Sequence, residues 1–269
     1  MKKTTSLLIP LAGLLCLALV ILGSLLAGTE ERLPPLAEVL TEKVSFSFTE
    51  ESDLNLIVTA RGWLLGYEQI VVPMNVKEYK GGPAPIESGR LNGQTEEETA
   101  GNEWYTVKTT RGLHYLMLQA PRDHVLLYRF KYVLAPPDEE EHTCGELLEL
   151  IYGLRSGRDV SGVTVFNAHD YASDRLTLSG RPAHQLCEAL QNAALRFSWN
   201  QEASVFTEHR DEEDYPSGSR VLRFVLPDGS EAADVTYYGT GSFNLYYGCY
   251  TPFLPEEETR ALNEILGLA

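Results

Sequence analysis

Residues 104–133 read WYTVKTTRGLHYLMLQAPRDHVLLYRFKYV, and this stretch decides the fold class of the chain. It contains three β-rich runs, Trp104–Thr110, His114–Gln119 and Val125–Val133, which are separated by two turn sequences. In the third run, large apolar or aromatic side chains alternate with polar or basic ones, as in a strand that is buried on one face. The stretch therefore predicts an antiparallel meander of three strands.

The residues around this meander extend the prediction. Before it, Leu54–Ala60 alternates at period two and Ile70–Val76 is a second apolar run, so both are expected to be strands. After it, Thr143 and Glu146 have the spacing of a capping box at the start of a helix. The apolar residues of that helix recur at helical spacing and would form one buried stripe: Leu147, Leu150, Ile151 and Leu154.

The second half of the chain repeats this order of elements. Apolar residues at positions i, i+3, i+4 and i+7 predict a helix over Pro182–Phe197. The other expected elements are strands over Gly162–Phe166, Arg175–Leu178, Val221–Leu226, Ala233–Tyr238 and Phe243–Tyr250, and a final helix over Pro255–Leu268. We therefore expect an α+β fold with two tandem modules, each an antiparallel three-strand meander packed with helix.

The N-terminus determines where the chain is expected to reside. Leu7–Ala27, LLIPLAGLLCLALVILGSLLA, is a run of 21 residues without a charge, and about 20 apolar residues span a bilayer as a helix. Lys2 and Lys3 precede the run and two glutamates follow it. Since positive residues stay on the cytoplasmic side, we expect a single-pass signal anchor in the cell membrane, with residues 28–269 outside. The alternative is a cleaved signal peptide that releases a secreted protein.

The expected domain organisation has five parts. They are a cytoplasmic tail (1–6), the transmembrane signal anchor (7–27), a stalk (28–42), a first module (43–157) and a second module (158–269). Within the first module, residues 80–103 contain almost no large apolar side chain and are expected to form a mobile loop.

The net charge argues against one class of partner. The chain has 38 acidic and 22 basic residues and a formal net charge of −16. Residues 28–269 hold 20 of the basic residues and all 38 acidic ones, so the part expected outside has a net charge of −18. Binding to nucleic acid needs a basic surface that neutralises phosphates. We therefore expect no nucleic-acid partner.

The cysteine and histidine residues are of the types that bind zinc, but their positions in the sequence do not predict a metal site. Three cysteines lie in the part expected outside, Cys144, Cys187 and Cys249, so at most one disulfide forms within it. The alternatives are a Cys144–Cys187 bridge or buried free thiols. Together with His142 and His184, Cys144 and Cys187 could form the four ligands of a tetrahedral zinc site. The two His–Cys pairs lie 40 residues apart on separate predicted modules, so no metal site is predicted.

Other candidate sites are weaker. Two acidic loops could offer oxygen ligands to calcium, but neither has the ligand spacing of a calcium-binding loop: Asn167, His169, Asp170 and Asp174 in the first, and His209 and Asp211–Asp214 in the second. The sequence contains no H-E-x-x-H, G-x-S-x-G or S-x-x-K motif of a hydrolase. We therefore predict no catalytic residue and no cofactor.

Tyrosines mark the best candidate for a binding surface. Exposed tyrosine on a sheet gives a large contact area at low entropic cost, and the last predicted meander contains Tyr237, Tyr238, Tyr246, Tyr247 and Tyr250. The layout of a short basic tail, one anchor helix and an acidic outer part is similar to that of bacterial envelope proteins. We expect a non-catalytic binding or accessory module for a protein, peptide or wall polymer. The alternative is an extracytoplasmic hydrolase with an unfamiliar active site.

Overall fold

The structure of the chain is a computed structural model. The residues that it describes are 33, 36, 56–70, 76–91, 94, 101–119, 125–168, 175–197, 218–227, 229, 231, 235–245 and 250–268. Residues 35–269 form one compact unit, and the separate unit 1–34 is described only at Leu33. The predicted tail and anchor therefore lie outside the described residues. Within the described ranges, no helix has the length and apolar character needed to cross a membrane.

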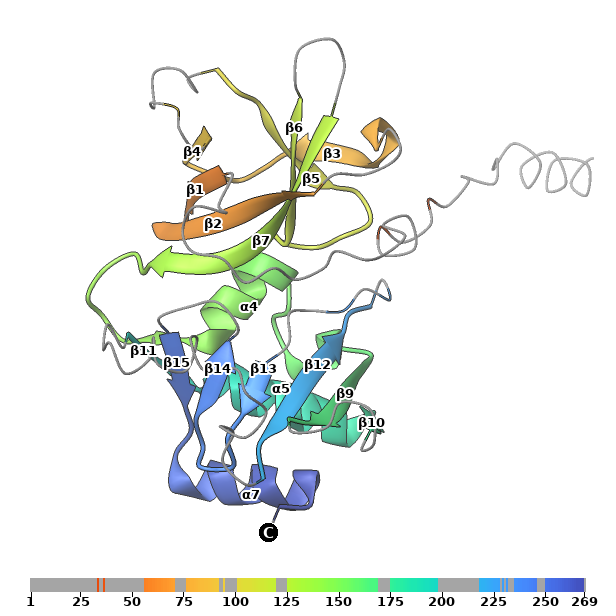
Figure 1. The fold of residues 1–269 in the computed structure, drawn as a ribbon, viewed down its shortest axis with the longest axis vertical. Helices are drawn as coiled ribbons and strands as arrows, with labels where there is room; N and C mark the ends of the chain where they lie inside the picture. Colours follow the sequence, from red (N-terminus) through yellow and green to blue (C-terminus); the bar gives the residue numbers. More distant parts are fainter. Residues whose placement is uncertain are drawn as a thin grey trace, which may run out of the picture. The chain divides into compact units, whose positions relative to one another are not determined.

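The first half of the compact unit builds a seven-stranded antiparallel sheet (Figure 1). In spatial order its strands are β3 (Lys80–Pro83), β5 (Trp104–Val107), β6 (Tyr115–Gln119), β7 (Val125–Ala135), β2 (Trp63–Ile70), β1 (Leu56–Ala60) and β4 (Ser88–Leu91). The predicted first meander is confirmed, because β5 pairs with β6 and β6 pairs with β7, both antiparallel.

One face of this sheet forms a core because successive side chains of a strand point to opposite faces. Leu56, Val58 and Ala60 of β1 are buried, whereas the residues between them are half-buried. The sheet also curls toward itself. A Cβ atom on Gly89 of β4 would lie 2.8 Å from Nε1 of Trp104 in β5, although four strands separate β4 from β5 along the sheet.

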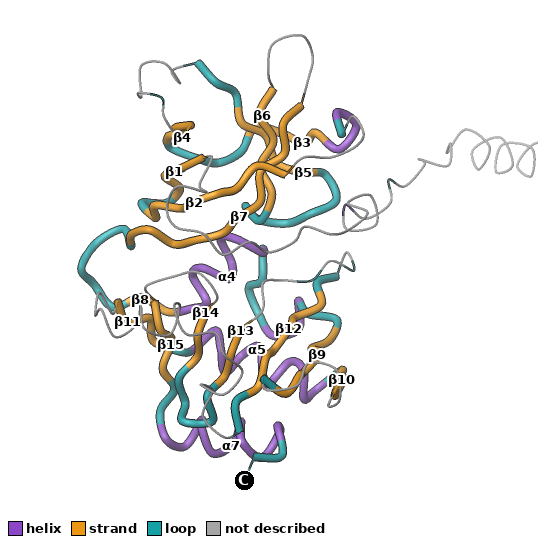
Figure 2. Tube along the Cα trace, viewed as in Figure 1, coloured by secondary structure: helices purple, strands orange, loops and turns teal. Residues whose placement is uncertain are grey.

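The compact unit contains two smaller antiparallel sheets, built from strands between residues 142 and 253 and coloured orange in Figure 2. The five-stranded sheet has the order β10 (Arg175–Ser179), β9 (Gly162–Asn167), β12 (Arg220–Val225), β13 (Val235–Tyr237) and β14 (Phe243–Leu245). The three-stranded sheet has the order β15 (Tyr250–Phe253), β11 (Ala194–Phe197) and β8 (His142–Thr143). The adjacent antiparallel strands β12, β13 and β14 confirm a second meander.

In the described ranges the α-helices are α4 (Cys144–Tyr152), α5 (Arg181–Asn192) and α7 (Glu256–Leu266), together with the 3₁₀ turns η2 (Lys77–Tyr79) and η4 (Gly157–Asp159). The predicted capping box at α4 is confirmed, because the Thr143 N–H donates to Oε1 of Glu146 over 3.2 Å. The expected apolar stripe of α5 is buried at Ala183, Leu186, Cys187 and Leu190. Helix α7 buries Leu262 and Leu266 and carries three glutamates in its first turn.

The two halves share one hydrophobic core. Buried side chains of the seven-stranded sheet, of α4, of α5 and of the five-stranded sheet belong to a single cluster. The loop before β6 connects the seven-stranded sheet to α4, because the Leu113 N–H donates to the Leu150 carbonyl over 2.9 Å. The Tyr67 hydroxyl of β2 donates to the Leu113 carbonyl over 2.7 Å. A Cβ atom on Gly112 would lie 2.6 Å from the Ile151 carbonyl oxygen, so this loop and α4 meet backbone to backbone.

Three expected elements differ in the structure. The predicted helix over Pro182–Phe197 ends at Asn192, because residues 194–197 pair as β11 with β15 and β8. The expected strand Phe243–Tyr250 is interrupted: β14 ends at Leu245, and Tyr250 begins β15 in another sheet. The expected loop over 80–103 contains the edge strands β3 and β4, since edge strands bond through their backbone and need few apolar side chains.

Candidate functional site

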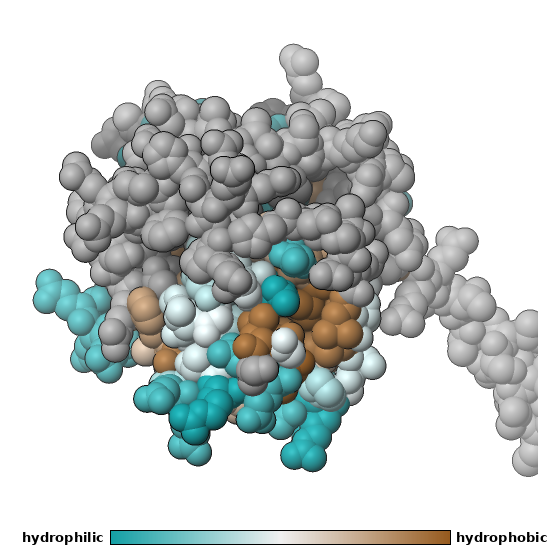
Figure 3. Space-filling model, turned by 60° about the horizontal axis from the view of Figure 1, so that its bottom comes forward, coloured by the Kyte–Doolittle hydropathy of each residue, from teal (hydrophilic) through white to brown (hydrophobic). Residues whose placement is uncertain are grey.

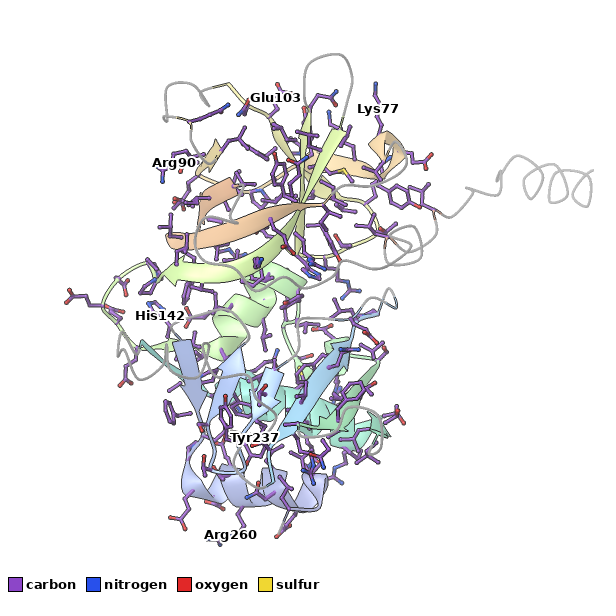
Figure 4. All side chains as sticks on the ribbon, viewed as in Figure 1. Lys77, Arg90, Glu103, His142, Tyr237 and Arg260 are labelled. Atoms are coloured by element: carbon purple, nitrogen blue, oxygen red, sulfur yellow. The ribbon has the colours of Figure 1, made fainter. Side chains whose placement is uncertain are left out.

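The predicted tyrosine surface is only partly described. Tyr237 is fully buried, and its hydroxyl donates to Oδ1 of Asn263 on α7 over 2.7 Å. Burial raises its pKa to about 12, against a smaller lowering by the Gly241 backbone. Figure 4 shows Tyr237 between β13 and α7. Tyr237 is therefore a core residue, and it cannot be part of the expected binding surface.

The other four tyrosines of this set differ in how much of each residue the structure describes. Tyr238 follows Tyr237 along the chain and is half-buried. Since neighbouring residues of an extended chain point to opposite sides, its side chain is directed away from α7. Tyr246 and Tyr247 lie outside the described residues, and Tyr250 is placed by its backbone alone, opposite Phe197 in the three-stranded sheet.

Cys144 and Cys187 are both buried free thiols, and no disulfide joins them. Burial raises the pKa of Cys144 far above its usual range, with a further contribution from nearby Cys187. Burial, followed by the charges of Asp159 and Glu188, raises the pKa of Cys187 to about 12. Cys249 lies outside the described residues. The two described thiols are therefore unreactive apolar side chains of the core.

The candidate zinc ligands are not assembled. His142 is engaged by two carboxylates, and His184 is half-buried on α5. In the described part of the chain, no group of three or more His, Cys, Asp or Glu side chains could hold a metal ion. Of the two acidic loops, Asn167 ends β9, whereas the remaining candidate calcium ligands lie outside the described residues.

The most distinctive polar arrangement is a histidine between two carboxylates. It lies at the junction of the two halves, by which we mean the region where β8 and α4 meet the seven-stranded sheet. Nδ1 of His142 lies 3.0 Å from Oε2 of Glu146, and Nε2 lies 3.0 Å from Oδ1 of Asp138. Carboxylates accept hydrogen bonds, so both ring nitrogens donate when His142 is an imidazolium. Its ring packs edge-on against Trp63 of β2 with centroids 5.0 Å apart. Figure 4 shows His142 beside the start of α4.

The charge of His142 depends on competing effects. Burial lowers the pKa of the ring, but the hydrogen bonds and charges of Glu146 and Asp138 together outweigh burial and raise it above its ordinary value. Glu146 has a second role, because its other oxygen accepts the Thr143 N–H at the helix start. His142 therefore couples the charge at the junction to the first turn of α4.

His114 is a second histidine at the junction, with the opposite behaviour. It is 5% exposed, and burial followed by the charge of Arg129 lowers its pKa to about 3. The rings of Tyr115 and Tyr152 lie 4.3 Å and 4.8 Å from it, measured between centroids. Its Nδ1 has no hydrogen-bond partner. His114 is therefore a neutral core residue at the pH values at which proteins work.

An ion cluster spans β2 and β7. Glu68 forms salt bridges with Arg129, directly opposite in register, and with Lys131, 3.1 Å from Oε2 to Nζ. Burial raises the pKa of Glu68, but the hydrogen bonds and charges of the two cations lower it below its usual value overall. All three side chains are at most 20% exposed. This cluster accordingly fixes the pairing of two central strands.

These three arrangements were not predicted from the sequence. The available signal was the spacing of Asp138 and Glu146, four positions before and after His142. However, Asp138 lies in a loop, His142 in β8 and Glu146 in α4. No helical periodicity therefore marks them. Comparison of the chain with protein-family models, with curated proteins and with solved structures finds no match.

Proposed function

We propose that this chain is a membrane-anchored extracytoplasmic protein whose folded part is a non-catalytic binding or accessory module for a protein, a peptide or a cell-envelope polymer. The observation that supports the anchor is the uncharged run Leu7–Ala27 behind Lys2 and Lys3. In this proposal residues 28–269 lie outside the membrane, where their net charge of −18 favours solubility.

The binding role is supported by the tyrosines that remain after Tyr237 is excluded. The half-buried Tyr238 side chain is directed away from α7, and we propose Tyr246, Tyr247 and Tyr250 as further residues of the binding region from the sequence alone. A contrasting surface lies on α7, whose exposed residues include Glu256, Glu257 and Arg260. Figure 3 shows hydrophilic residues at this end of the molecule, next to an apolar area.

Fractionation tests the membrane part of the proposal. The full chain should remain in the membrane after alkaline extraction, and external protease should digest residues 28–269 in cells without an outer barrier. Recovery of the chain in the soluble fraction would contradict the anchor. Protection of the folded part from protease would contradict the orientation.

Site-specific photocrosslinking tests the binding part. A photoreactive phenylalanine analogue at position 238, 246, 247 or 250 should form crosslinks in the native membrane that saturate with expression level. The matched control is the same analogue at Glu257, which is exposed on α7. Equal crosslinking from position 257 and from the tyrosine positions would contradict a binding surface at the tyrosines.

A further inference from the structure

Strand β10 lies at the edge of the five-stranded sheet. It covers the five residues Arg175–Ser179 and pairs with β9 on one side, while among the described strands none pairs with its other side. The side chains of Leu176, Thr177 and Ser179 are exposed, and Leu178 is half-buried. The outward backbone groups of this strand can therefore accept a further strand.

Edge strands are usually protected against such pairing by proline, lysine, bulges or short length. In the seven-stranded sheet, edge strand β3 contains Gly81, Gly82 and Pro83 and has a register shift against β5. In the three-stranded sheet, edge strand β8 has two residues. Strand β10 has none of these devices, because its register with β9 is continuous over all five residues and its one charged residue, Arg175, is at its start.

The side chains of β10 make this edge apolar on one face. Leu176 lies opposite Val165 of β9, Val165 lies opposite Leu222, and Leu222 lies opposite Val235, so one row crosses four strands. The three inner members of the row are at most 3% exposed, whereas Leu176 is 46% exposed. Among the described residues, Leu176 is the only large hydrophobic residue that is exposed. The apolar row therefore continues to the edge and ends open to solvent.

We propose that β10 is a self-association edge, at which β10 of a second copy of this chain pairs antiparallel about Thr177. In this register Thr177 of each copy lies on the two-fold axis. Leu176 lies opposite Leu178 of the second copy, and Arg175 lies opposite Ser179 of the second copy. Two apolar contacts thus form on the helix side of the sheet. The two five-stranded sheets become one continuous sheet, and the two-fold symmetry consumes both edges so that assembly stops at a dimer.

The choice of a second copy rests on two observations. The sequence Leu176-Thr177-Leu178 is symmetric about its centre, so the strand supplies its own complementary partner. In addition, the five residues of β10 contain one arginine and no acidic residue, in a chain whose net charge is −16. Two copies that pair through these residues place no carboxylate of one strand opposite a carboxylate of the other, and at the rise of a strand the two Arg175 positions would lie roughly 14 Å apart, beyond the screening length at physiological salt.

Cysteine crosslinking tests the register. Cys16 and Cys249 are replaced by serine in the full chain, while the buried Cys144 and Cys187 are kept. Thr177→Cys then places two thiols on the axis, where directly opposite Cβ atoms of paired strands are close enough for a disulfide. The matched control is Arg90→Cys, at an exposed position on β4, which is an edge strand of the seven-stranded sheet.

The expected result is a disulfide-linked dimer of Thr177→Cys under mild oxidation, formed at least tenfold faster than with Arg90→Cys. A crosslink to a chain of different mass would show that β10 binds another protein and would overturn the proposal. Equal rates for the two variants would also overturn it.

A second variant tests the apolar contact by measuring mass. Leu176→Asp changes an exposed side chain, so the fold is retained, and circular dichroism with a thermal melt checks this. Sedimentation of the purified full chain in mild detergent should give a dimer for the wild type and for Arg90→Asp, and a dissociation constant at least tenfold weaker for Leu176→Asp. A wild-type monomer, or a Leu176→Asp chain that associates as strongly as wild type, would overturn the proposal.

Discussion

The imidazolium of His142 is shared between Asp138 and Glu146, and this arrangement makes the junction sensitive to pH. The pKa of His142 is raised in the folded chain above its ordinary value of about 6.5. A raised folded pKa stabilises the fold fully at pH values below 6.5, and this contribution is lost as the pH rises through the folded pKa. The junction should therefore be stronger in mildly acidic than in alkaline solution.

We expect His142→Gln to lower the free energy of unfolding by about 0.5–1 kcal/mol more at pH 5.5 than at pH 9, since the two carboxylates are half exposed and their ion pairs are weak. Urea unfolding followed by tryptophan fluorescence at both pH values measures this difference. His184→Gln is the matched control, because it changes a histidine outside this cluster. An effect of His142→Gln that is the same at both pH values would contradict the ion-pair interpretation.

Tyr237 and Asn263 offer a second test at a single contact. We expect Tyr237→Phe to cost about 1 kcal/mol of unfolding free energy, because it leaves Oδ1 of Asn263 without its 2.7 Å donor. A double-mutant cycle with Asn263→Ala should give a coupling of about 0.5–1.5 kcal/mol. Tyr105→Phe is the control, since the Tyr105 hydroxyl bonds the exposed Glu103. Additive effects of the two changes would show that the hydrogen bond adds no stability.

The 3₁₀ turn η4 packs closely against α5. A Cβ atom on Gly157 would lie 2.2 Å from the carbonyl oxygen of His184, which is closer than non-bonded atoms can approach. The side chain of Gln191 on α5 also donates to the Leu154 carbonyl over 3.1 Å. Glycine is therefore required at position 157 by the contact and not by its backbone angles.

We expect Gly157→Ala to lower the free energy of unfolding by about 1–3 kcal/mol, because the backbone of α5 must move to admit a methyl group. Denaturant unfolding measures the change. Gly82→Ala is the control, since a Cβ atom there meets nothing within 4 Å, and a change within about 0.5 kcal/mol is expected for it. A Gly157→Ala chain as stable as that control would contradict the close approach.

The elements that could be predicted from sequence are those with local causes. The capping box at Thr143 and the strand over Val125–Val133 have causes in neighbouring residues, and both elements are confirmed. The expected burial on one face of that strand is not, because adjacent residues such as Leu127 and Tyr128 are both buried. The end of α5 could not be predicted, because Ala194–Phe197 continues the helical spacing and becomes a strand through pairing with distant β15. The contacts of His142 likewise depend on how a loop returns to a helix.

The hydrophobic cluster that the two halves share bears on the two modules predicted from the sequence. Side chains from both halves pack in one cluster, and a backbone hydrogen bond joins Leu113 to Leu150. The compact unit covers residues 35–269. The boundary predicted near residue 157 therefore divides the order of elements, while the packing continues across it.

Removal of residues 1–27 is expected to give a soluble folded chain, because the compact unit begins after them and residues 28–269 carry a net charge of −18. The measurement is the fraction of protein left in the supernatant after ultracentrifugation without detergent, compared with the full chain. Circular dichroism confirms that the soluble product is folded. A truncated chain that sediments as fully as the full chain would contradict both the anchor and the limits of the unit.

The three-stranded sheet also imposes an order on synthesis. It joins His142–Thr143, Ala194–Phe197 and Tyr250–Phe253, so its pairing spans more than 100 residues of chain. During vectorial synthesis from the N-terminus, the seven-stranded sheet has all its strands once residue 135 has emerged, whereas this small sheet must wait for residue 253. Pairing over such sequence separation is slow. The start of α4 thus lies beside an incomplete three-stranded sheet until residue 253 has been synthesised, more than 100 residues after the helix itself begins.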